Sequence, residues 1–402
     1  MLFFYLLAAV AIWFGIQSLL SGFRYASYVK RETAKPLPDF TPFVSLIAPS
    51  RGLEPGLEEN VIALFQQDYP AFEILFVFDR ASDAAVAAIE SLQREHPHVD
   101  AHTVIAGPAN DSGQKVHNLR VATTQVSSRC EVLVFVDTDA RPGRTWLRQL
   151  VGPLIDVDLG ASSGYRWFVP VLGGISSRLR SVWNASVASA LGADQRKNFC
   201  WGGSTAIRKS LFDKLAVRER WRGSVSDDFT VTRILQESNM PIHFTPSCLV
   251  ASVGDCDFHE LLEFTTRQIK ITRVYAPHLW KPVLLGGFLF AITFFGGIGL
   301  LLWRVASGES YLLLLLLLSI IFLLGAAKSY VRWKAVRATL PKYRRELNRD
   351  LIAHLVFWPF TSMLYLYNAI AAAFSQQIAW RGITYELKSP VEAVIISRES
   401  GD

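Results

Sequence analysis

Acidic residues directly after two apolar runs are the first candidates for chemistry in this sequence. Asp79 ends the run EILFVFD, and Asp137 ends VLVFVD, with Asp139 two residues later. In open α/β sheets ligands bind where the carboxyl ends of strands meet, and side chains two apart in an extended chain point the same way. Asp137 and Asp139 can therefore face one divalent cation, because Mg²⁺ and Mn²⁺ prefer oxygen ligands and bridge to phosphates. A single Asp after a strand is usually a turn former, but the three acids together favour a functional site.

A second acidic pair, Asp227 and Asp228, stands at the start of the helix-like run FTVTRILQE. Asp is a common helix N-cap, so one acid can cap the helix while the other faces a cleft. A carboxylate within hydrogen-bond reach of an acceptor hydroxyl can act as a general base. The nearby glycines Gly202 and Gly203 would let a ligand approach the backbone closely; the alternative is an ordinary turn before a strand.

Two basic residues, Arg267 and Lys270, lie three apart in the expected helix FHELLEFTTRQIKITRVY. Residues three apart share one face of a helix, so this pair could bind a diphosphate, Arg as a planar fork and Lys as a point charge. The alternative is that both are cations that extend to a membrane interface.

The segment that must position these residues, about 39–280, alternates strand-like and helix-like patterns. Such alternation is typical of a largely parallel α/β sheet. The expected strands cover 44–48, 73–78, 99–106, 132–136, 202–207 and 242–244. The expected helices cover 57–67, 84–94, 116–125 and 228–237.

Apolar segments flank this polar stretch on both sides. Residues 2–23 carry no charge before Arg24, and a spanning helix needs about 20 apolar residues. A cleaved signal peptide is the alternative, but the basic leading region and a clear A-x-A cleavage site are missing, so a membrane anchor is favoured. Segments 283–303 and 311–327 are expected to form a hairpin of two further spans.

The segment 351–374 is interpreted as one more span. His354 and Pro359 weaken its apolar pattern, so a re-entrant or interfacial helix is the alternative.

Composition agrees with a membrane protein. Half of the 402 residues are hydrophobic and the formal net charge is +6, with a mean hydropathy of +0.24. The basic residues cluster beside the apolar segments, at 24–35 and 328–349, so they suit lipid headgroups better than nucleic acid. By the positive-inside rule these basic segments stay cytosolic, which predicts a multi-pass integral membrane protein with segment 39–257 in the cytosol. The four cysteines form no CxxC pair, so neither a zinc site nor a disulfide framework is expected.

Ordered motifs along the chain resemble the ceramide glucosyltransferase family and related family-2-type and family-21-type membrane glycosyltransferases. The motifs are VSLIAPSRGLEPGLEENVIALFQQDYPAFEILFVFD, GQKVHNLR, FVDTDARPG, WGGSTAIRKS, SDDF and TRQIKI. The resemblance covers nearly the whole chain, including one N-terminal and several C-terminal spans. It implies an α/β GT-A type nucleotide-sugar-binding domain with transmembrane helices. It also implies an inverting transfer of a hexose, with glucose favoured, from a UDP-sugar to a membrane lipid hydroxyl.

The same resemblance implies roles for individual residues. It implies that the nucleotide-sugar is contacted by Asp79, Lys115, Asp137, Arg267 and Lys270. It implies that Mg²⁺ or Mn²⁺ is bound by Asp137 and Asp139, and that the catalytic base is Asp228.

Three positions depart from the family pattern. Lys270 and Ile271 replace an Arg-Trp pair, so the planar fork and the aromatic platform are lost. Arg51 stands where the family often has Lys. Both acids of the metal motif are present, whereas many ceramide enzymes carry only the first, which leans towards bacterial-type lipid glycosyltransferases. The expected acceptor is therefore ceramide, diacylglycerol, a sterol or a hopanoid.

The expected organisation has six parts. These are an anchor at 1–24, a linker at 25–38, the GT-A domain at 39–257, an interfacial helix at 258–281, transmembrane helices at 282–375 with a basic loop at 328–350, and a C-terminal tail at 376–402. Two other functions stay open. A processive polysaccharide synthase is disfavoured by the few spans and by Ile271. A non-catalytic membrane scaffold is disfavoured because the candidate acids are all present.

Overall fold

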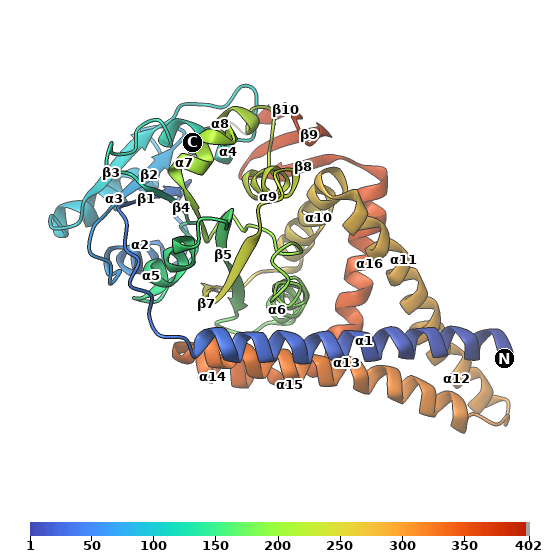
Figure 1. Cartoon of the computed structure of the whole chain (residues 1–402). Coiled ribbons are helices and arrows are strands. Elements are labelled where there is room, and N and C mark those ends of the chain that lie inside the picture. Colours follow the sequence, from blue (N-terminus) through green and yellow to red (C-terminus); the bar gives the residue numbers. More distant parts are fainter. Residues whose placement is uncertain (399–402) are drawn as a thin grey trace. The chain divides into compact units, whose positions relative to one another are not determined.

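The computed structural model describes residues 1–398, and these form two compact units. The helical unit contains residues 1–30, 170–189 and 255–375, and the sheet unit contains the remaining stretches, which begin at Arg31, Ala190 and Gln376. The chain therefore leaves and re-enters each unit, as the sequence colours in Figure 1 show.

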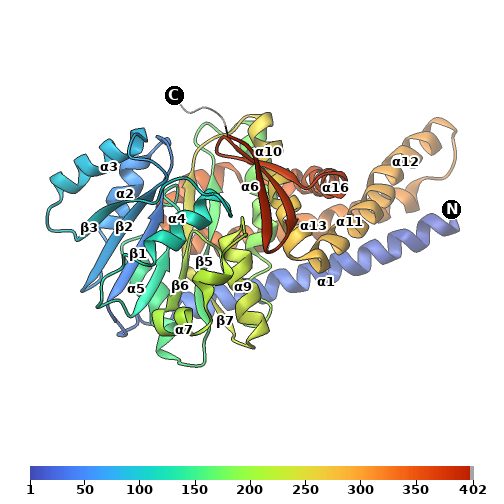
Figure 2. The ribbon, with the colours of Figure 1, turned by 90° about the horizontal axis from the view of Figure 1, so that it is seen from above.

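A seven-stranded sheet with the order β3-β2-β1-β4-β6-β5-β7 forms the centre of the sheet unit (Figure 2). Its strands are β1 Val44–Pro49, β2 Phe72–Phe78, β3 Ala101–Ile105, β4 Val132–Phe135, β5 Ala161–Val169, β6 Thr205–Arg208 and β7 Ile242–Val253. The first four strands in this order are parallel, and so are β5 and β7. The expected largely parallel sheet needs one correction, because β6 runs antiparallel to both β4 and β5.

Helices connect these strands. They are α2 Leu57–Phe65, α3 Ala84–Glu95, α4 Gln114–Ala122, α5 Trp146–Val151, α7 Lys209–Lys214, α8 Val217–Arg220 and α9 Asp227–Glu237, with a 3₁₀ turn at Gly152–Ile155. Of these, α2, α3, α4 and α9 lie where helices are expected, whereas the short helices α5, α7 and α8 have no counterpart among the expected elements. The strands β1, β2 and β4 are almost wholly buried apolar runs, as expected for strands covered on both faces. Phe135 on β4 packs edge-on against Trp221, which also packs against Phe212.

Strand β5 has no counterpart among the expected elements. Its sequence ASSGYRWFV does not read as an apolar run, yet Ser162 and Ser163 are fully buried. The Ser162 hydroxyl lies 2.9 Å from the Thr245 hydroxyl, and Ser163 donates to the Ser204 carbonyl at 3.2 Å. Buried hydroxyls with partners carry little penalty, so this strand packs in the core without a hydrophobic signature.

The segment expected as a C-terminal tail is folded where the structure describes it. Residues up to 398 form an antiparallel sheet with the order β10-β9-β8, and residues 399–402 lie outside the described part. The strands are β8 Gln377–Trp380, β9 Ile383–Ser389 and β10 Glu392–Arg398. This sheet belongs to the sheet unit.

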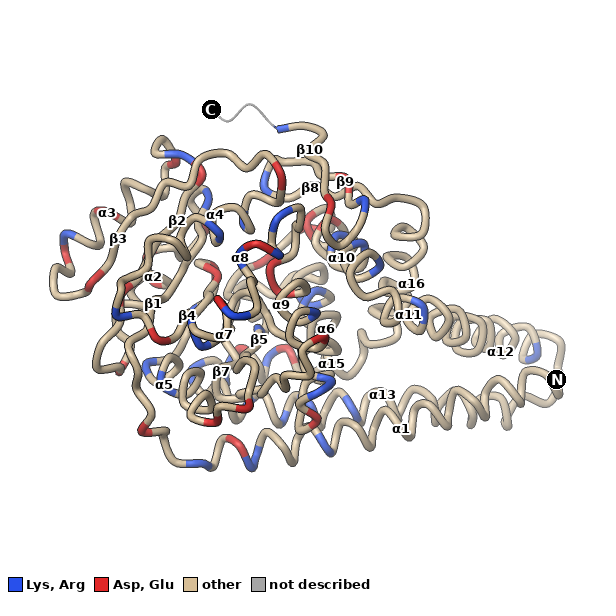
Figure 3. Tube along the Cα trace, turned by 45° about the horizontal axis from the view of Figure 1, so that its top comes forward, with Lys and Arg blue, Asp and Glu red and all other residues tan. Residues whose placement is uncertain are grey.

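The helical unit holds the apolar segments. Its elements are α1 Leu2–Thr33, of which the last residues belong to the sheet unit, α6 Ile175–Ala188, α10 Phe258–Tyr275, α11 Pro277–Phe290, a π-helical turn at Ala291–Phe295, α12 Gly296–Ala306, α13 Leu312–Thr339, a 3₁₀ turn at Pro341–Tyr343, α14 Arg344–Arg349, α15 Leu351–Val356 and α16 Trp358–Phe374. Three stretches in the described residues are long and apolar enough to cross a membrane: Leu2–Thr33, Pro277–Ala306 and Leu312–Thr339. Figure 3 shows how few charges these helices carry. They indicate membrane association, at the positions where three of the spans are expected.

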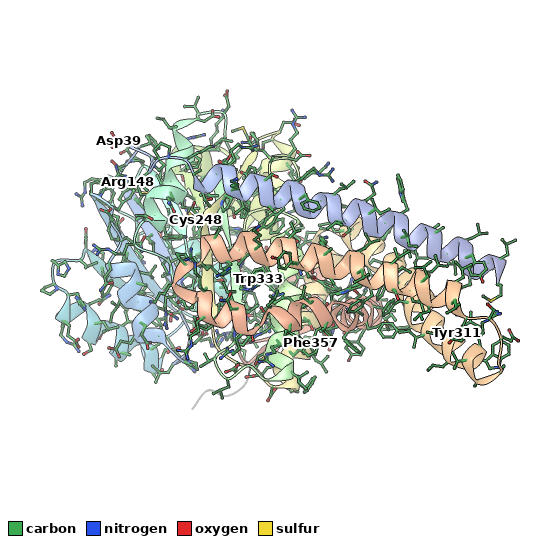
Figure 4. All side chains as sticks on the ribbon, turned by 90° about the horizontal axis from the view of Figure 1, so that it is seen from below. Asp39, Arg148, Cys248, Tyr311, Trp333 and Phe357 are labelled. Atoms are coloured by element: carbon green, nitrogen blue, oxygen red, sulfur yellow. The ribbon has the colours of Figure 1, made fainter. Side chains whose placement is uncertain are left out.

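Small residues let α1 pack against α13, and both helices run side by side in Figures 1 and 4. A Cβ at Gly15 would lie 3.0 Å from the Leu324 side chain, and one at Gly22 would lie 3.3 Å from that of Lys328. The Lys328 ammonium donates to the Ser18 hydroxyl at 2.7 Å. The basic segment expected as the loop 328–350 is largely helical, because α13 continues to Thr339.

The segment 351–374 differs from the single span that its composition suggests. The helix breaks at Phe357 into α15 with 6 residues and α16 with 17, which is shorter than the roughly 20 residues of a typical span. Helix α16 also carries a buried side-chain amide, that of Asn368, whose oxygen accepts from the Thr266 hydroxyl on α10 at 3.0 Å. Next to it, the Trp280 indole on α11 donates to the Ala369 carbonyl at 3.1 Å. The break at Phe357 and the length of α16 therefore separate this segment from the three long apolar helices.

Gly164 on β5 provides a test of the packing in the sheet unit. A Cβ at this position would lie 2.2 Å from the Cys248 carbonyl oxygen on β7 and 2.5 Å from the Ser204 hydroxyl. Because the first neighbour is backbone, Gly164→Ala should destabilise the fold by about 3 kcal/mol. The thermal unfolding midpoint of the full chain in detergent micelles should fall by several degrees. The matched variant Gly143→Ala, with no atom within 4 Å of the added carbon, should unfold near the wild-type midpoint, and an equal fall in both variants would contradict the packing.

Candidate active site

Lys115 joins two acidic residues at the carboxyl edge of the sheet. Its ammonium lies 2.7 Å from Asp137, which follows β4, and 3.4 Å from Asp227 at the start of α9. Burial lowers the pKa of Lys115, but the negative charges of Asp137, Asp227 and Asp228 outweigh burial, so its pKa is raised. Lys115 therefore carries its positive charge and links the end of a strand to the start of a helix.

Two helices begin next to each other at this point. The Gly113 amide, just before α4, donates to the Ser224 carbonyl at 2.8 Å, and a Cβ at Gly113 would lie 3.0 Å from the Val225 Cα. Helix N-termini carry partial positive charge, which favours anionic groups nearby. The arrangement suits both the acidic side chains of this chain and an anionic ligand.

The cap of α9 is a hydroxyl and not a carboxylate. Ser226 accepts from the Phe229 amide at 3.3 Å, so the prediction that one acid of the Asp227-Asp228 pair caps the helix was wrong. Both acids are thereby available for other contacts. Asp227 is buried against Lys115, whereas Asp228 is partly exposed and accepts from the Gly202 amide at 3.4 Å.

The glycines of the CWGGSTAIRK motif make room for these acids. A Cβ at Gly202 would lie 2.2 Å from Asp227 Oδ2 and 2.8 Å from the Lys115 ammonium, and one at Gly203 would lie 2.8 Å from Asp137 Oδ2. Any side chain at either position would push into the charged cluster. The glycines lie in the turn before β6 and make room for side chains of the chain itself. The predicted close approach of a ligand to this backbone stays a prediction.

The cluster holds more negative than positive charge. Burial raises the pKa of Asp227 to about 7; the charge of Lys115 opposes this, and those of Asp228 and Asp137 add to it. One ammonium thus faces three carboxyl groups, an arrangement that a cation or a shared proton would stabilise.

Asp139, two residues after Asp137, faces a different cation. Its Oδ2 lies 3.7 Å from Arg166 on β5, while its Oδ1 is buried and has no hydrogen-bond partner among the described residues. Burial and the charge of Asp137 raise the pKa of Asp139. An acceptor oxygen that is buried without a donor is a group that a metal ion would satisfy, so Asp137 and Asp139 fit the divalent cation that the sequence predicts.

The turn that presents these two acids is held from α2. The Asn60 amide donates to the Thr138 carbonyl at 3.0 Å, and Arg141 donates to the Asn60 side-chain oxygen at 2.8 Å. Neither Asn60 nor Arg141 is among the predicted site residues. Their contribution depends on contacts 78 and 81 residues apart in the chain, which spacing alone does not reveal.

Asp79 lies at the same edge of the sheet, at the end of β2. Its Oδ2 is 3.7 Å from Arg51, which follows β1, and its Oδ1 is buried with no hydrogen-bond partner among residues 1–398. Strand β1 separates β2 from β4, so a spacing of about 4.8 Å per strand puts Asp79 and Asp137 about 10 Å apart across the edge.

Arg267 and Lys270 belong to the helical unit, on α10. Arg267 pairs with Glu263 at 3.2 Å, one turn earlier on the same helix, and Lys270 donates to the Ser375 hydroxyl at 3.4 Å. Partial burial lowers the pKa of Lys270. The predicted binding of a diphosphate by these two residues stays a prediction.

Among the described residues, the group whose three ligand atoms have metal-ligand spacing lies at the opposite edge. Glu73, Asp100 and His102 come together near the amino ends of β2 and β3. Glu73 already accepts from the Ser45 hydroxyl at 2.5 Å and from the Ser127 amide at 2.7 Å. Its oxygen therefore has protein donors, and this group is explained by hydrogen bonds within the sheet unit.

Comparisons with known proteins relate the chain to glycosyltransferases. A ceramide glucosyltransferase from Komagataella phaffii is 32% identical over 124 residues, 28% of this chain and 24% of that protein. Ceramide glucosyltransferase 1 from Caenorhabditis elegans is 32% identical over 100 residues, 25% of this chain and 21% of that protein. The matched segments thus span only about a quarter of these relatives.

Two of the solved structures that match the chain are a mannosyltransferase and a glucosyl-3-phosphoglycerate synthase. A mannosyltransferase from Pyrobaculum calidifontis, solved with GDP-Man and Mn²⁺, is 19% identical with a TM-score of 0.49 and covers 92% of this chain and 98% of that one. A glucosyl-3-phosphoglycerate synthase from Mycobacterium tuberculosis, solved with Mn²⁺ and UDP-glucose, is 14% identical with a TM-score of 0.36 and covers 62% of this chain and 82% of that one.

The sequence profile described as "Glycosyl transferase family 21" matches residues 3–393, nearly the whole chain. This match, together with the mixed α/β sheet and the long apolar helices, confirms the predicted fold class and the predicted resemblance. The chain therefore belongs to glycosyl transferase family 21 and is a glycosyltransferase.

Proposed function

We propose that this glycosyltransferase moves a hexose, with glucose favoured, from a UDP-sugar to a hydroxyl of a membrane lipid, with inversion at the anomeric carbon. The observation that carries the proposal is the gathering of four carboxylates at one edge of the sheet. Asp79 follows β2, Asp137 and Asp139 follow β4, and Asp228 is the second residue of α9. An edge where strands end is the usual ligand site of an α/β sheet.

The donor diphosphate would occupy the part of this edge next to Asp137 and Asp139. These two acids would hold Mg²⁺ or Mn²⁺, which would supply charge neutralisation for a nucleoside diphosphate leaving group. Lys115 is a further cation within the cluster, and the adjoining N-termini of α4 and α9 favour an anion. The contribution of the chain is to orient the diphosphate so that the sugar carbon faces the acceptor.

Asp228 is the proposed general base. It is partly exposed and is oriented by donors from the Phe229 amide at 2.7 Å and the Gly202 amide at 3.4 Å. Asp227 suits this role less well, because it is buried against Lys115. In an inverting transfer the acceptor oxygen attacks C1 from the face opposite the leaving group, while Asp228 takes the hydroxyl proton.

Membrane helices and relatives support a lipid as acceptor. Three long apolar helices would keep the enzyme at a bilayer, and the relatives named above are called ceramide glucosyltransferases. Under the positive-inside rule, the basic segments at 24–35 and 328–349 support a cytosolic position for the sheet unit. Ceramide, diacylglycerol, a sterol and a hydroxylated hopanoid each offer at least one hydroxyl that could accept the sugar.

A membrane assay tests the function as a whole. Membranes with the overexpressed protein, incubated with radiolabelled UDP-glucose or other UDP-hexoses and total lipid extract, should give one labelled lipid that yields its sugar on hydrolysis. The reason is that a single lipid hydroxyl accepts one hexose. Long water-soluble polymer would support a polysaccharide synthase instead, and no transfer from any UDP-sugar would contradict the proposal.

Asp228→Asn tests the proposed base. The amide cannot take the proton, so kcat should fall by about 10² to 10⁴-fold, while UDP affinity, measured by calorimetry, should stay within about threefold of wild type because the diphosphate is held by other residues. Asp194→Asn is the matched control, since Asp194 is exposed and its carboxylate contacts near neighbours in the chain, the Lys197 ammonium at 3.1 Å and the Arg196 amide at 3.3 Å. Turnover at the wild-type rate in Asp228→Asn would remove this residue from the role.

Asp139→Asn tests the metal site. With UDP present, saturating Mn²⁺ should stabilise the wild-type chain by about 2–3 kcal/mol at 100 times its dissociation constant, seen as a rise in the thermal unfolding midpoint. The variant removes one carboxylate ligand, so most of that rise should disappear. An unchanged Mn²⁺-dependent rise in Asp139→Asn would place the ion elsewhere, and full activity in excess EDTA would remove the metal requirement.

A further inference from the structure

The C-terminal strands β8 and β9 bury one face in the sheet unit, and β10 pairs with β9 at the exposed edge. Ile378, Ile383, Tyr385 and Leu387 are each at most 3% exposed, and along β9 the buried residues alternate with more exposed ones. The turn after β9 also packs closely, since a Cβ at Gly223 would overlap the Val391 carbonyl. This small sheet is therefore a fixed part of the sheet unit and not an extended tail.

Three polar contacts fasten it to the edge where Asp79 lies. The Gln114 amide, at the start of α4, donates to the Tyr385 hydroxyl at 3.1 Å. Arg398 donates to the Ala109 carbonyl in the loop after β3, and Arg381 forms an ion pair with Glu54 in the loop after β1. The small sheet thus bridges loops on both sides of the end of β2.

Arg381 occupies a conformation that costs energy. It has a φ of 53° and is followed by Gly382 at 69°, so both central residues of the β8–β9 hairpin are left-handed. Hairpins of this kind favour Asn-Gly, and a non-glycine residue with positive φ costs of the order of 1 kcal/mol. An arginine at the first position is therefore not explained by the turn itself.

The surroundings of Arg381 contain a second arginine and unmatched polar atoms. Partial burial and the positive charge of Arg51 lower the pKa of Arg381. Arg51 Nη1 and Asp79 Oδ1 are both buried with no hydrogen-bond partner among the described residues, while the Arg381 side chain is 49% exposed. One buried acceptor, Asp79 Oδ1, thus lies beside the Arg51 guanidinium. Arg381 reaches the same loop after β1, where its Nη2 pairs with Glu54, and its other N–H groups can still donate to a ligand.

Uracil presents the complementary pattern. Its edge carries an N–H between two carbonyl oxygens, so the N–H can donate to a carboxylate while each oxygen accepts from an arginine. Guanine offers one carbonyl oxygen beside two N–H donors and would leave one arginine without an acceptor. Polar groups that a ligand leaves unpaired in a buried site reduce affinity strongly.

We infer that the C-terminal sheet completes the donor site, and that Arg381, with Arg51 and Asp79, recognises the uracil of the donor nucleotide. The inference rests on the proposed function in that it takes the donor to be a UDP-sugar. It adds a specificity-determining residue from strands that follow the last helix of the chain, and it gives the strained turn a role. The diphosphate end of the donor would remain with Asp137 and Asp139, further along the same edge.

Arg381→Asn is a sharp test because it improves the turn while it removes the guanidinium. The full chain, in lipid nanodiscs with Mn²⁺, is titrated with UDP and with GDP by calorimetry. Wild type should bind UDP at least tenfold more tightly than GDP. Arg381→Asn should weaken UDP binding about tenfold, as expected for a lost charged hydrogen bond. The ratio of UDP affinity to GDP affinity should therefore be smaller than in wild type. Its unfolding midpoint should be no lower than that of wild type.

Two control variants separate recognition from support of the fold. Lys388→Ala, on the same small sheet and paired with Glu386, should bind UDP like wild type. Glu54→Gln removes the ion pair but keeps the guanidinium, so it should retain the preference for UDP over GDP. Losses in Glu54→Gln equal to those in Arg381→Asn would show that Arg381 only braces the loop, and would overturn the inference.

The outcomes also distinguish this inference from the proposed function. If wild type binds UDP tightly and Arg381→Asn binds it equally well with the same preference over GDP, the inference is wrong and the proposed function stands. If wild type binds no UDP, the proposed function fails and the inference fails with it.

Discussion

The ion pair of Lys115 with Asp137 and Asp227 is the interaction on which the site depends. It joins three elements that are distant in sequence: the end of β4, the start of α4 and the start of α9. A largely buried lysine keeps its charge when nearby carboxylates offset the cost of burial, and here Asp137, Asp227 and Asp228 do so. The same contacts demand glycine at 202 and 203, where any side chain would enter the cluster. The charge of Lys115, the glycines at 202 and 203 and the position of α9 therefore depend on one another.

The sequence predicted the elements that form continuous apolar runs. Strands β1, β2 and β4 are such runs, and the acids that follow them were found because an abrupt change from apolar to acidic residues is visible locally. Strand β5 was missed because its buried serines are satisfied by hydroxyl and carbonyl partners from β7 and from the residue before β6. That information lies in the tertiary structure. Because β5 was not predicted, Arg166, which β5 brings next to Asp139, was not predicted as a site residue either.

The C-terminal strands were missed for a different reason. ITYELKS has buried residues at every second position, a pattern that predicts a half-buried strand, but the segment follows a membrane-like helix and is short. A short hairpin is marginal alone and becomes stable only when its apolar face is covered. The cover here comes from loops that precede it by more than 270 residues, as the bond between Gln114 and Tyr385 shows. The alternating residues of this segment could have predicted a strand, but they could not have predicted which part of the protein covers it.

The division of the chain adds a constraint on assembly. The sheet unit is built from segments that begin at Arg31, Ala190 and Gln376, and the segments between them belong to the helical unit. The C-terminal strands β8, β9 and β10 are therefore synthesised only after α10 to α16. Because contacts of high sequence separation cost loop-closure entropy before they return stability, the seven-stranded sheet can form its core before the C-terminal sheet adds its contacts. If that sheet belongs to the donor site, nucleotide recognition is the last part of the sheet unit to be completed, and it is completed only in a chain that already carries its apolar helices.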